Sequence, residues 1–177
     1  MSPRLDPLFA FLDSLDDRAP LSDLVEALEG SEVEFDDLAS HVRFSERAYQ
    51  RIPIRGGPWY QAWVMCWRNG QRSLIHDHKG SSCAVRVLDG TLTETLFEFA
   101  PSGHVKATFS RDVLPGQVIG GEDSDLHQVS NLQASNANLV TLHVYSPPLV
   151  YMGTYDLFST ARGQEPMMMM FCDAAGI

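Results

Sequence analysis

The segment LIHDHKGSSCAVRVLDG, residues 74–90, places two histidines and a cysteine at the entrance to a β-branched, apolar run. His76 and His78 are two residues apart, and side chains at positions i and i+2 of a strand point to the same face. Because imidazole is the commonest metal ligand in proteins, both rings can bind one ion. An isolated pair of this kind is more often an exposed polar pair, so the rest of the chain decides between the two interpretations.

The overall charge limits the partners of this chain. It has 177 residues, with 13 Lys and Arg against 23 Asp and Glu, which gives a formal net charge of −10. A nucleic-acid binder needs a basic face, and an anionic membrane attracts basic segments, so we expect neither partner. A small anionic substrate would therefore have to be held by a local cation.

The cysteines and the N-terminal stretch indicate a cytoplasmic protein. Cys66, Cys83 and Cys172 are odd in number and sparse, unlike the disulfide framework of a small secreted domain. The stretch MSPRLDPLFAFLDSLDD interrupts its apolar residues with acids, so it predicts neither a signal peptide nor a membrane span. We expect a cytoplasmic monomer.

The first 45 residues carry a helical pattern. Apolar residues recur at helical spacing in APLSDLVEALEG, residues 19–30, with Ser22 as a candidate N-cap and Gly30 as the stop. A second segment, SEVEFDDLASHVRF, residues 31–44, places Phe35, Leu38 and Val42 on one face. We therefore predict an N-terminal helical segment.

The rest of the chain has a β pattern. Its apolar runs are short, rich in β-branched or aromatic residues and separated by Gly, Pro, Asn and Asp, which favours an antiparallel sandwich or barrel. We predict one mainly β domain over residues 1–177, with helices in residues 1–45 and a β-barrel in residues 46–177. The runs are YQAWVMCW (60–67), CAVRVLDG (83–90), TLTETLFEF (91–99), HVKATFS (104–110), LVTLHVY (139–145) and YMGTYDLF (151–158).

The spacing of residues 70–90 resembles the first motif of the cupin superfamily, in which a metal-binding glutamate usually stands at the position of Cys83. His127, in HQVSN, matches the end of the second cupin motif. The resemblance implies a cupin fold, which is a small antiparallel β-barrel or jelly roll, and a metal ion bound by His76, His78 and His127.

A site of three neutral histidines has a defined chemistry. It binds a divalent ion without compensating its charge and leaves half of an octahedral shell open. Such a site can take an anionic thiolate together with O2. Iron(II) suits this redox chemistry, because zinc prefers to stay four-coordinate and does not activate O2.

Four segments taken in order resemble the hallmark segments of the cysteine dioxygenases, a thiol dioxygenase family within the cupin superfamily. The resemblance covers about residues 45–172 and implies oxidation of L-cysteine by O2 to cysteine sulfinate. A small thiol amino acid and O2 would be the partners, with Fe(II) as the cofactor. The segments are CWRNGQRSLIHDHKGSSC, VLDGTLTETLFE, DLHQVSN and TLHVYSPP.

The same resemblance implies roles for residues around the metal. Cys83 would form a thioether with Tyr145, and the Ser146–Pro147 bond resembles a cis peptide of the family that turns Tyr145 into the site. His143 and Thr141 would form a hydrogen-bond relay to Tyr145; the family often has serine where Thr141 stands.

A cation for the substrate carboxylate is available in AYQRIP. Arg51 lies 25 residues before His76, the spacing at which the family carries a tyrosine and an arginine, and Tyr49 flanks it. The planar guanidinium can pair with a carboxylate through two hydrogen bonds. Related 3-mercaptopropionate dioxygenases tend to carry glutamine there, and Gln50 is adjacent, so a shift of one residue in the alignment would change the substrate.

The remaining candidates lie outside the predicted metal ligands and carboxylate site. Trp67 belongs to an apolar strand and is expected just outside the site, whereas His41 and His104 are expected at the surface. Met169 and Cys172 are expected in a C-terminal strand, with Met169 near the pocket.

Two other functions stay open. The chain can be a dioxygenase for another small thiol, such as 3-mercaptopropionate, which a panel of thiols would reveal. It can also be a non-catalytic cupin that binds a metal or ligand, although its acidic charge and the lack of a basic recognition helix argue against a DNA-binding sensor.

Overall fold

A computed structural model describes residues 2–134 and 136–167 of the chain. Its N-terminal part is helical, as predicted, and within the described part no helix is long and apolar enough to cross a membrane. The helical elements are the 3-10 turn η1 (Pro3–Leu5), α1 (Asp6–Asp13), α2 (Leu21–Gly30), α3 (Phe35–Leu38) and the 3-10 turn η2 (Ala39–His41).

The prediction that Ser22 caps the second helix is wrong. The N-cap residue of α2 is Pro20, which provides no side-chain cap. Ser22 lies in the first turn, where its hydroxyl donates a hydrogen bond to the Asp23 carboxylate instead. A proline fixes an extended backbone before the helix, so α2 begins one residue before Ser22.

Nine strands form one antiparallel sheet within the described residues. The hydrogen-bonded order is β1-β2-β7-β3-β6-β4-β5, and the β8–β9 hairpin is attached to β3. The strands are β1 (Gln50–Gly57), β2 (Tyr60–Trp67), β3 (Ile75–Asp89), β4 (Leu92–Phe99), β5 (Val105–Val113), β6 (Val118–Ser130), β7 (Leu139–Ser146), β8 (Tyr151–Tyr155) and β9 (Gly163–Pro166).

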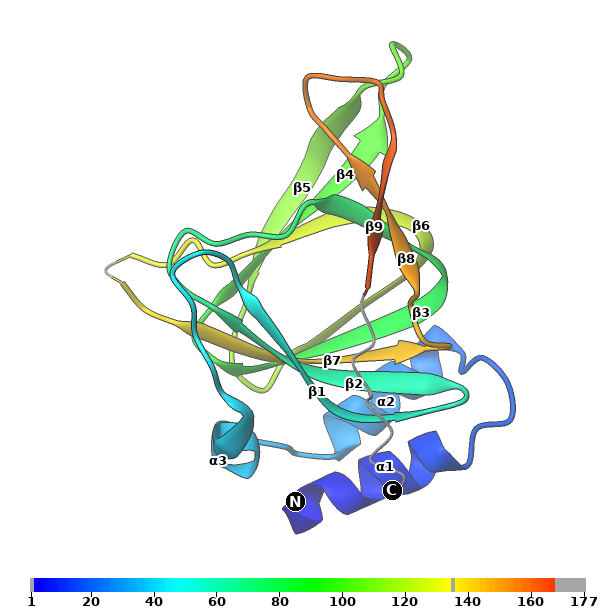
Figure 1. Cartoon of the computed structure of the whole chain (residues 1–177), viewed down its shortest axis with the longest axis vertical. Coiled ribbons are helices and arrows are strands. Elements are labelled where there is room, and N and C mark those ends of the chain that lie inside the picture. The colour runs from blue at the N-terminus through cyan, green and yellow to red at the C-terminus, as the bar shows by residue number, and fades with distance from the viewer. Residues whose placement is uncertain (1, 135, 168–177) are drawn as a thin grey trace, which may run out of the picture.

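The sheet curls into an incomplete barrel (Figure 1). Its path begins at β1 and ends at β5, and no ladder between these two strands closes it among the residues described. The mainly β, antiparallel prediction with an N-terminal helical segment is confirmed. The two long central strands, β3 and β6, pair with each other and carry the histidine motifs identified in the sequence.

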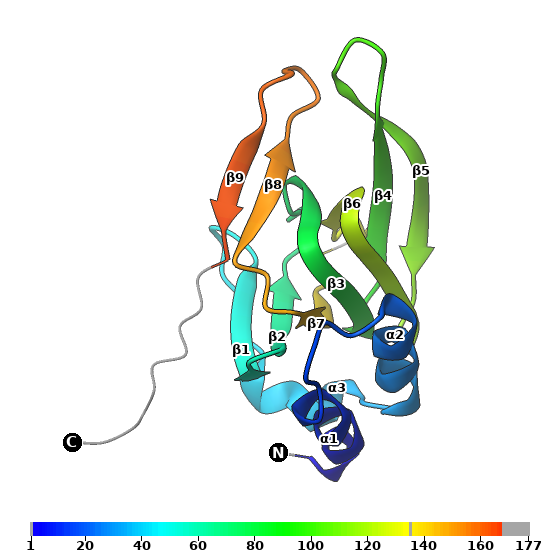
Figure 2. The same ribbon diagram turned by 90° about the vertical axis from the view of Figure 1, so that its right-hand side faces the viewer.

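The helices cover the outer face of the sheet below β1, β2 and β7 in Figure 1, and α2 lies beside β3 and β6 in Figure 2. Apolar residues of α1 and α2 pack on alternate residues of β2, which are Ala62, Val64 and Cys66. The residues between and after them, Trp63, Met65 and Trp67, belong to a second apolar cluster on the inner side of the sheet. Both faces of β2 are therefore buried, which explains its continuous apolar sequence.

The contact between α2 and β6 depends on a glycine. A Cβ atom at Gly120 would lie 2.7 Å from Leu21 Cδ1 and 3.2 Å from the Cys83 carbonyl oxygen. A side chain at this position would crowd the helix and the backbone of the neighbouring strand β3, and glycine avoids both contacts. Gly120 therefore allows the helix to pack directly behind the strand that carries His76 and His78.

Candidate metal centre

The three predicted histidines converge from two neighbouring strands. His76 and His78 lie on β3, and His127 lies on β6 directly opposite His76. All three are buried, and their candidate ligand atoms lie within 4.8 Å of one another. The β3–β6 register shifts on both sides of His78, and irregularities of this kind change the direction of a side chain next to a site.

Hydrogen bonds fix the orientation of two of the rings. His76 Nδ1 lies 2.9 Å from the Leu74 carbonyl oxygen, and His127 Nδ1 lies 3.0 Å from Glu94 Oε1. Both acceptors require a proton on Nδ1, so in the neutral rings each Nε2 carries a lone pair. Metal-binding histidines commonly have this arrangement.

The facing nitrogens fit a metal ion. His76 Nε2 and His127 Nε2 are 3.2 Å apart, a repulsive arrangement of two lone pairs unless a cation lies between them. Burial, with the neighbouring His127, lowers the pKa of His76 to about 3, so a shared proton is disfavoured at neutral pH. Two nitrogens on one ion at about 2.1 Å would be roughly 2.9 to 3.4 Å apart, depending on the angle.

Glu94 on β4 supports the site and was not identified from the sequence. Its carboxylate is buried, accepts the hydrogen bond from His127 and forms an ion pair with Arg111 at 2.7 Å. Burial alone would raise the pKa of Glu94, but His127 and Arg111 outweigh it and hold the pKa below its usual value. The sequence does contain an indication of this role. Glu94 shares a strand face with the apolar residues Leu92 and Leu96, and an acid on an apolar face indicates a buried carboxylate that needs a partner.

The residue between the first two histidines points away from them. Asp77 accepts hydrogen bonds from the Gly153 backbone N–H at 2.8 Å and from the Tyr155 hydroxyl at 2.7 Å. Its carboxylate lies so close to β8 that a Cβ atom at Gly153 would be 2.5 Å from Asp77 Oδ2. Asp77 therefore attaches the β8–β9 hairpin beside the metal centre.

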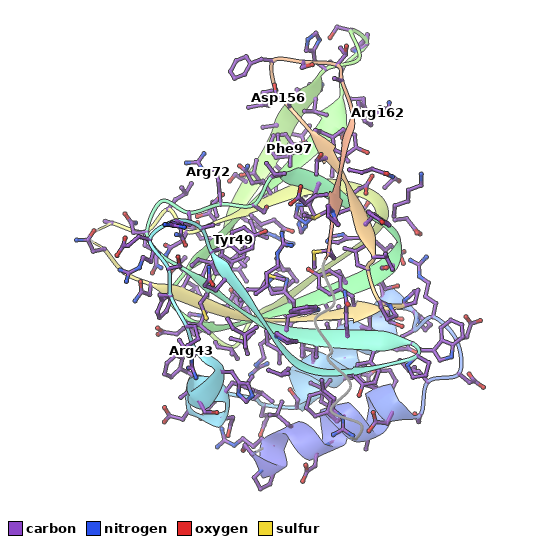
Figure 3. The ribbon with its side chains drawn as sticks, viewed as in Figure 1. Arg43, Tyr49, Arg72, Phe97, Asp156 and Arg162 are labelled. Carbon is purple, nitrogen blue, oxygen red and sulfur yellow. The ribbon has the colours of Figure 1, made fainter. Side chains whose placement is uncertain are left out.

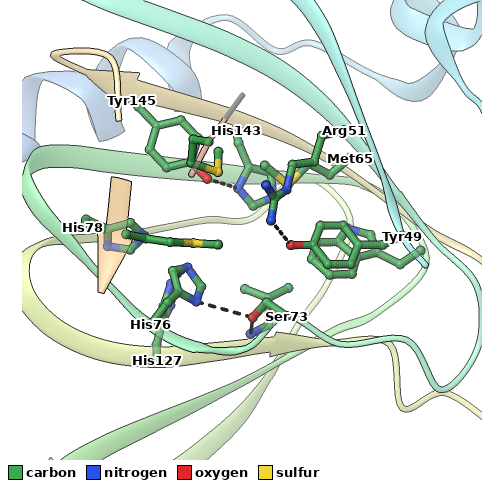
Figure 4. A pocket seen from close by; sticks show the side chains of 13 residues that line it. Tyr49, Arg51, Met65, Ser73, His76, His78, His127, His143 and Tyr145 are labelled. Atoms are coloured by element: carbon green, nitrogen blue, oxygen red, sulfur yellow. Dashed lines mark hydrogen bonds between the residues drawn. The ribbon is translucent and has the colours of Figure 1, made fainter. Parts of the chain in front are cut away.

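The histidines open into a pocket of about 310 Å³ (Figure 4). The pocket brings together most of the site residues predicted from the sequence. It is also lined by three methionines and two further residues that were not predicted. Predicted residues that line it are Tyr49, Arg51, Trp67, His76, His78, His127, His143 and Tyr145; the additional residues are Met65, Ser73, Val129, Met152 and Met167. Met169 and Cys172 lie outside the described residues.

Arg51, and not Gln50, faces this pocket. Arg51 pairs with Met65 across the β1–β2 ladder, and both line the pocket. Gln50 pairs with Cys66, whose side chain belongs to the cluster on the helix side, and its amide donates to the Ala48 and Tyr49 carbonyl oxygens. The alternation of side chains along β1 thus separates the two neighbours.

An aromatic stack holds Arg51. Its guanidinium donates a hydrogen bond to the Tyr49 hydroxyl, as the dashed line in Figure 4 shows. The Tyr49 ring stacks on Trp67 with centroids 4.0 Å apart and an angle of 15° between the planes. Trp67 itself is buried, so the stack fixes the direction of Arg51 into the pocket.

A chain of hydrogen bonds runs along the pocket-facing side of β7. Trp67 Nε1 donates to Thr141 Oγ1 at 3.1 Å, Thr141 Oγ1 lies 2.9 Å from His143 Nε2, and His143 Nδ1 lies 3.4 Å from the Tyr145 hydroxyl. Burial lowers the pKa of His143 and raises that of Tyr145, so both stay neutral at pH 7. The predicted relay residues are therefore in contact, and Trp67 is joined to them.

Cys83 and Tyr145 are neighbours across the β3–β7 ladder, and both are buried. Burial raises the pKa of the Cys83 thiol. Ser82 and Ser146 form the adjacent pair of the same ladder, and both bind the backbone of Ala19. Ser82 Oγ donates to the Ala19 carbonyl oxygen, and the Ala19 N–H donates to Ser146 Oγ, each at 2.9 Å. The Ser146–Pro147 bond is cis, as expected.

The two remaining histidines, His41 and His104, lie outside the metal centre. Each is partly exposed, and the nearest hydrogen-bond partner of each ring is a serine hydroxyl, that of Ser40 for His41 and that of Ser102 for His104. They offer matched controls for substitutions of the three clustered histidines.

The fold and the site define a cupin-type protein with three clustered histidines that could hold a metal ion. Similar solved structures include an uncharacterized conserved protein from Klebsiella pneumoniae with a double-stranded β-helix domain, at TM-score 0.57 and 14% identity over 67% of this chain and 88% of that one. TT1209 from Thermus thermophilus is similar at TM-score 0.53 and 21% identity, over 65% of this chain and 98% of that one. At these identities the likeness concerns the double-stranded β-helix fold alone.

The sequence comparison identifies the family. The family described as "Cysteine dioxygenase type I" matches residues 8–157, so the chain belongs to that family. Cysteine dioxygenase type 1 of Rattus norvegicus is 33% identical over 129 residues, which are 71% of this chain and 62% of the rat protein. The Bos taurus protein of the same name is 31% identical over 151 residues, 83% of this chain and 72% of that protein. The match thus spans about three fifths of the rat relative's length.

Proposed function

We propose that this protein is a cysteine dioxygenase that binds Fe(II) and oxidises L-cysteine to cysteine sulfinate. One observation carries the proposal: a guanidinium, that of Arg51, and the three clustered histidines open into the same small pocket. A carboxylate and a thiol of one small molecule can then be bound at the same time. Membership of the family supports the reaction type.

The donor set supports iron. His76, His78 and His127 are neutral donors that would hold Fe(II) without compensating its charge, which favours an anionic thiolate as a further ligand. When bound, Fe(II) would supply the redox chemistry that O2 requires and that zinc does not offer. Glu94 would keep His127 oriented through its Nδ1 proton.

The reaction balances with O2 as the oxidant. The thiol R–SH and O2 combine to give R–SO2H, in which sulfur loses four electrons and both oxygen atoms become bound to it. No other reductant or oxidant is needed. The protein must therefore hold the thiol and the carboxylate in place and keep other reactants away.

The residues of the pocket provide these functions. Arg51 would bind the substrate carboxylate, and Tyr49 would keep the guanidinium pointing inwards. The Tyr145 phenol, kept protonated by its burial, can donate a hydrogen bond to the substrate sulfur or its oxygens, and His143 orients it. Met65, Met152 and Met167 form an apolar wall that excludes water.

An Arg51→Gln variant tests the proposal against a Gln50→Ala control. After anaerobic iron loading, we expect kcat/KM for L-cysteine to fall about 100-fold in R51Q, the loss of a charge-assisted bidentate pair, with cysteamine affected less than threefold. Q50A should match the wild type. O2 uptake and mass spectrometric identification of cysteine sulfinate give the readout.

Other outcomes would point to the alternatives. Equal losses of cysteine and cysteamine turnover in R51Q would contradict the role of Arg51 as a carboxylate ligand. Turnover of 3-mercaptopropionate but not of cysteine would indicate a dioxygenase for another thiol. If the iron-loaded protein consumed no O2 with any thiol, a non-catalytic cupin would replace the proposed enzyme.

A further inference from the structure

A second, open hollow of about 1230 Å³ adjoins the pocket, and we call it the entrance groove. Arg47, Tyr49, Arg51, Arg72 and Glu165 are among the residues that line it. Tyr49 and Arg51 also line the inner pocket, so the two hollows meet at their side chains. The entrance groove therefore adjoins the inner pocket at the Arg51 guanidinium and offers a route from solvent toward the histidines.

The arginines of this groove differ from the others in their partners. In the described part of the chain, most arginines already have a partner in the protein. Five pair with carboxylates: Arg4, Arg18, Arg55, Arg68 and Arg111. Four have other partners. Arg43 and Arg86 donate to backbone carbonyl oxygens, Arg162 lies over the Phe99 ring, and Arg51 donates to the Tyr49 hydroxyl.

The remaining two arginines, Arg47 and Arg72, line the entrance groove together with Arg51. None of them lies within 4.0 Å of a carboxylate of a described residue, and Arg47 and Arg72 are exposed. Glu165 is the acidic residue among the groove's lining residues. A chain with a net charge of −10 thus places two exposed guanidinium groups, those of Arg47 and Arg72, beside Arg51 at the mouth of one pocket.

We propose that the entrance groove is a capture site for small thiols that carry a carboxylate, with Arg47 and Arg72 as the residues that select them. This inference rests on the proposed function and extends it to the entry of the substrate. A cleft lined by one sign of charge raises the local concentration of the opposite ion. The carboxylate is attracted by Arg47 and Arg72 and then passes to Arg51, which is less exposed and held by Tyr49.

Selection by charge makes an ordered prediction for three thiols. At neutral pH, 3-mercaptopropionate is anionic, cysteine is zwitterionic with no net charge, and cysteamine is cationic. The groove should therefore lower KM most for 3-mercaptopropionate, less for cysteine, and not at all for cysteamine. Because Arg47 and Arg72 are exposed, added salt should weaken the effect.

The experiment compares the double variant Arg47→Gln/Arg72→Gln with Arg162→Gln as the control. Each change removes positive charge from an exposed arginine, but Arg162 is not among the residues that line the entrance groove, and Figure 3 shows it above Arg72 and Tyr49, on the other side of the view. For the iron-loaded wild type, KM for 3-mercaptopropionate should rise about fivefold as ionic strength increases from about 0.02 M to about 0.2 M. In the double variant, KM at low salt should already be about fivefold higher, with kcat within twofold and little further change with salt.

The cysteamine and control arms decide the outcome. KM for cysteamine should not rise in the double variant, because the lost charges do not attract a cation. R162Q should keep the salt dependence of the wild type. A double variant with the same KM and the same salt dependence as R162Q would overturn the proposal.

A binding measurement separates this proposal from the proposed enzyme. Titration of the metal-free protein with 3-mercaptopropionate, followed by NMR, needs no turnover. If the wild type oxidised no thiol, the proposed function would fail, but binding at least threefold weaker in the double variant than in R162Q would still support the groove. Equal binding in both variants would overturn it.

Discussion

β2 and β7 are buried on both faces, yet their two faces contain different chemistry. On the helix side, β7 contributes Leu142 and Val144 to an apolar cluster with α1 and α2. On the pocket side, Thr141, His143 and Tyr145 form the hydrogen-bond chain. Neighbouring residues of one strand therefore serve stability and chemistry separately, and a shift of one residue in register would exchange the two sets.

The largest effect is expected at the metal. A His76→Ala variant should lose most of its bound metal and its activity, by about a thousandfold or more, because one of three ligands is removed. Plasma mass spectrometry of the iron-loaded protein measures the metal content. His104→Ala, which changes a partly exposed histidine, should bind metal as the wild type does. A full metal content in H76A would exclude this residue as a ligand.

A smaller loss of metal affinity is expected from a change at the carboxylate that supports His127. Glu94→Gln should lower metal affinity about 10- to 100-fold, because the carboxylate that orients His127 is replaced by a weaker acceptor. Competition with a chelator measures the affinity. Glu98 lies exposed on the same strand, so Glu98→Gln supplies the matched control. Unchanged affinity in E94Q would show that the Glu94 contact does not support the metal.

The two buried cysteines, Cys83 and Cys66, allow the pocket side and the helix side of the sheet to be compared by the same substitution. Cys83 faces the pocket side beside Tyr145, whereas Cys66 packs with the helices. Cys83→Ala should slow turnover about tenfold through misplacement of Tyr145 and keep the metal. Cys66→Ala should leave turnover within twofold of the wild type.

Intact mass provides a second readout for the cysteines. A thioether removes two hydrogens, about 2 Da. The lighter species should occur in the wild type and in C66A, and should be absent from C83A. Its persistence in C83A would rule out Cys83 as the linked residue, and metal loss in C83A would instead make Cys83 a ligand.

The smallest effect on the reaction is expected on the helix side. Leu142 is fully buried, so Leu142→Ala should lower the free energy of unfolding by about 2–5 kcal/mol. At a temperature where the variant is fully folded, kcat should stay within twofold of the wild type. Urea denaturation and steady-state kinetics measure the two quantities. A large loss of kcat in the folded variant would show that the two faces of β7 are not independent.

Much of the fold could be predicted from apolar patterns. β2 was expected over its observed residues, because both of its faces are buried and its sequence is apolar throughout. β6 was not recognised as a strand, since glycines and acids interrupt its apolar residues. It forms because it pairs with both β3 and β4, and Gly120 leaves room where α2 lies against it. Those reasons involve distant segments and are not visible in local sequence.

The site was predictable where spacing carries the information. His76, His78 and His127 stand at motif positions, and the structure brings them together. Glu94 was missed because its partner, His127, is 33 residues further along the chain. The methionine wall was missed for a similar reason, since its residues come from separate parts of the chain and have no distinctive spacing.

The attachment of β8 by Asp77 has a consequence for how substitutions in the motif should be interpreted. Residues 76–78 serve two purposes. His76 and His78 supply nitrogen donors for an ion, whereas Asp77 holds the β8–β9 hairpin, which contributes Met152 to the pocket. A change at Asp77 can therefore leave the metal content intact while it loosens one wall of the pocket. Metal analysis alone would not detect such a change, whereas turnover of several thiols compared with the wild type would.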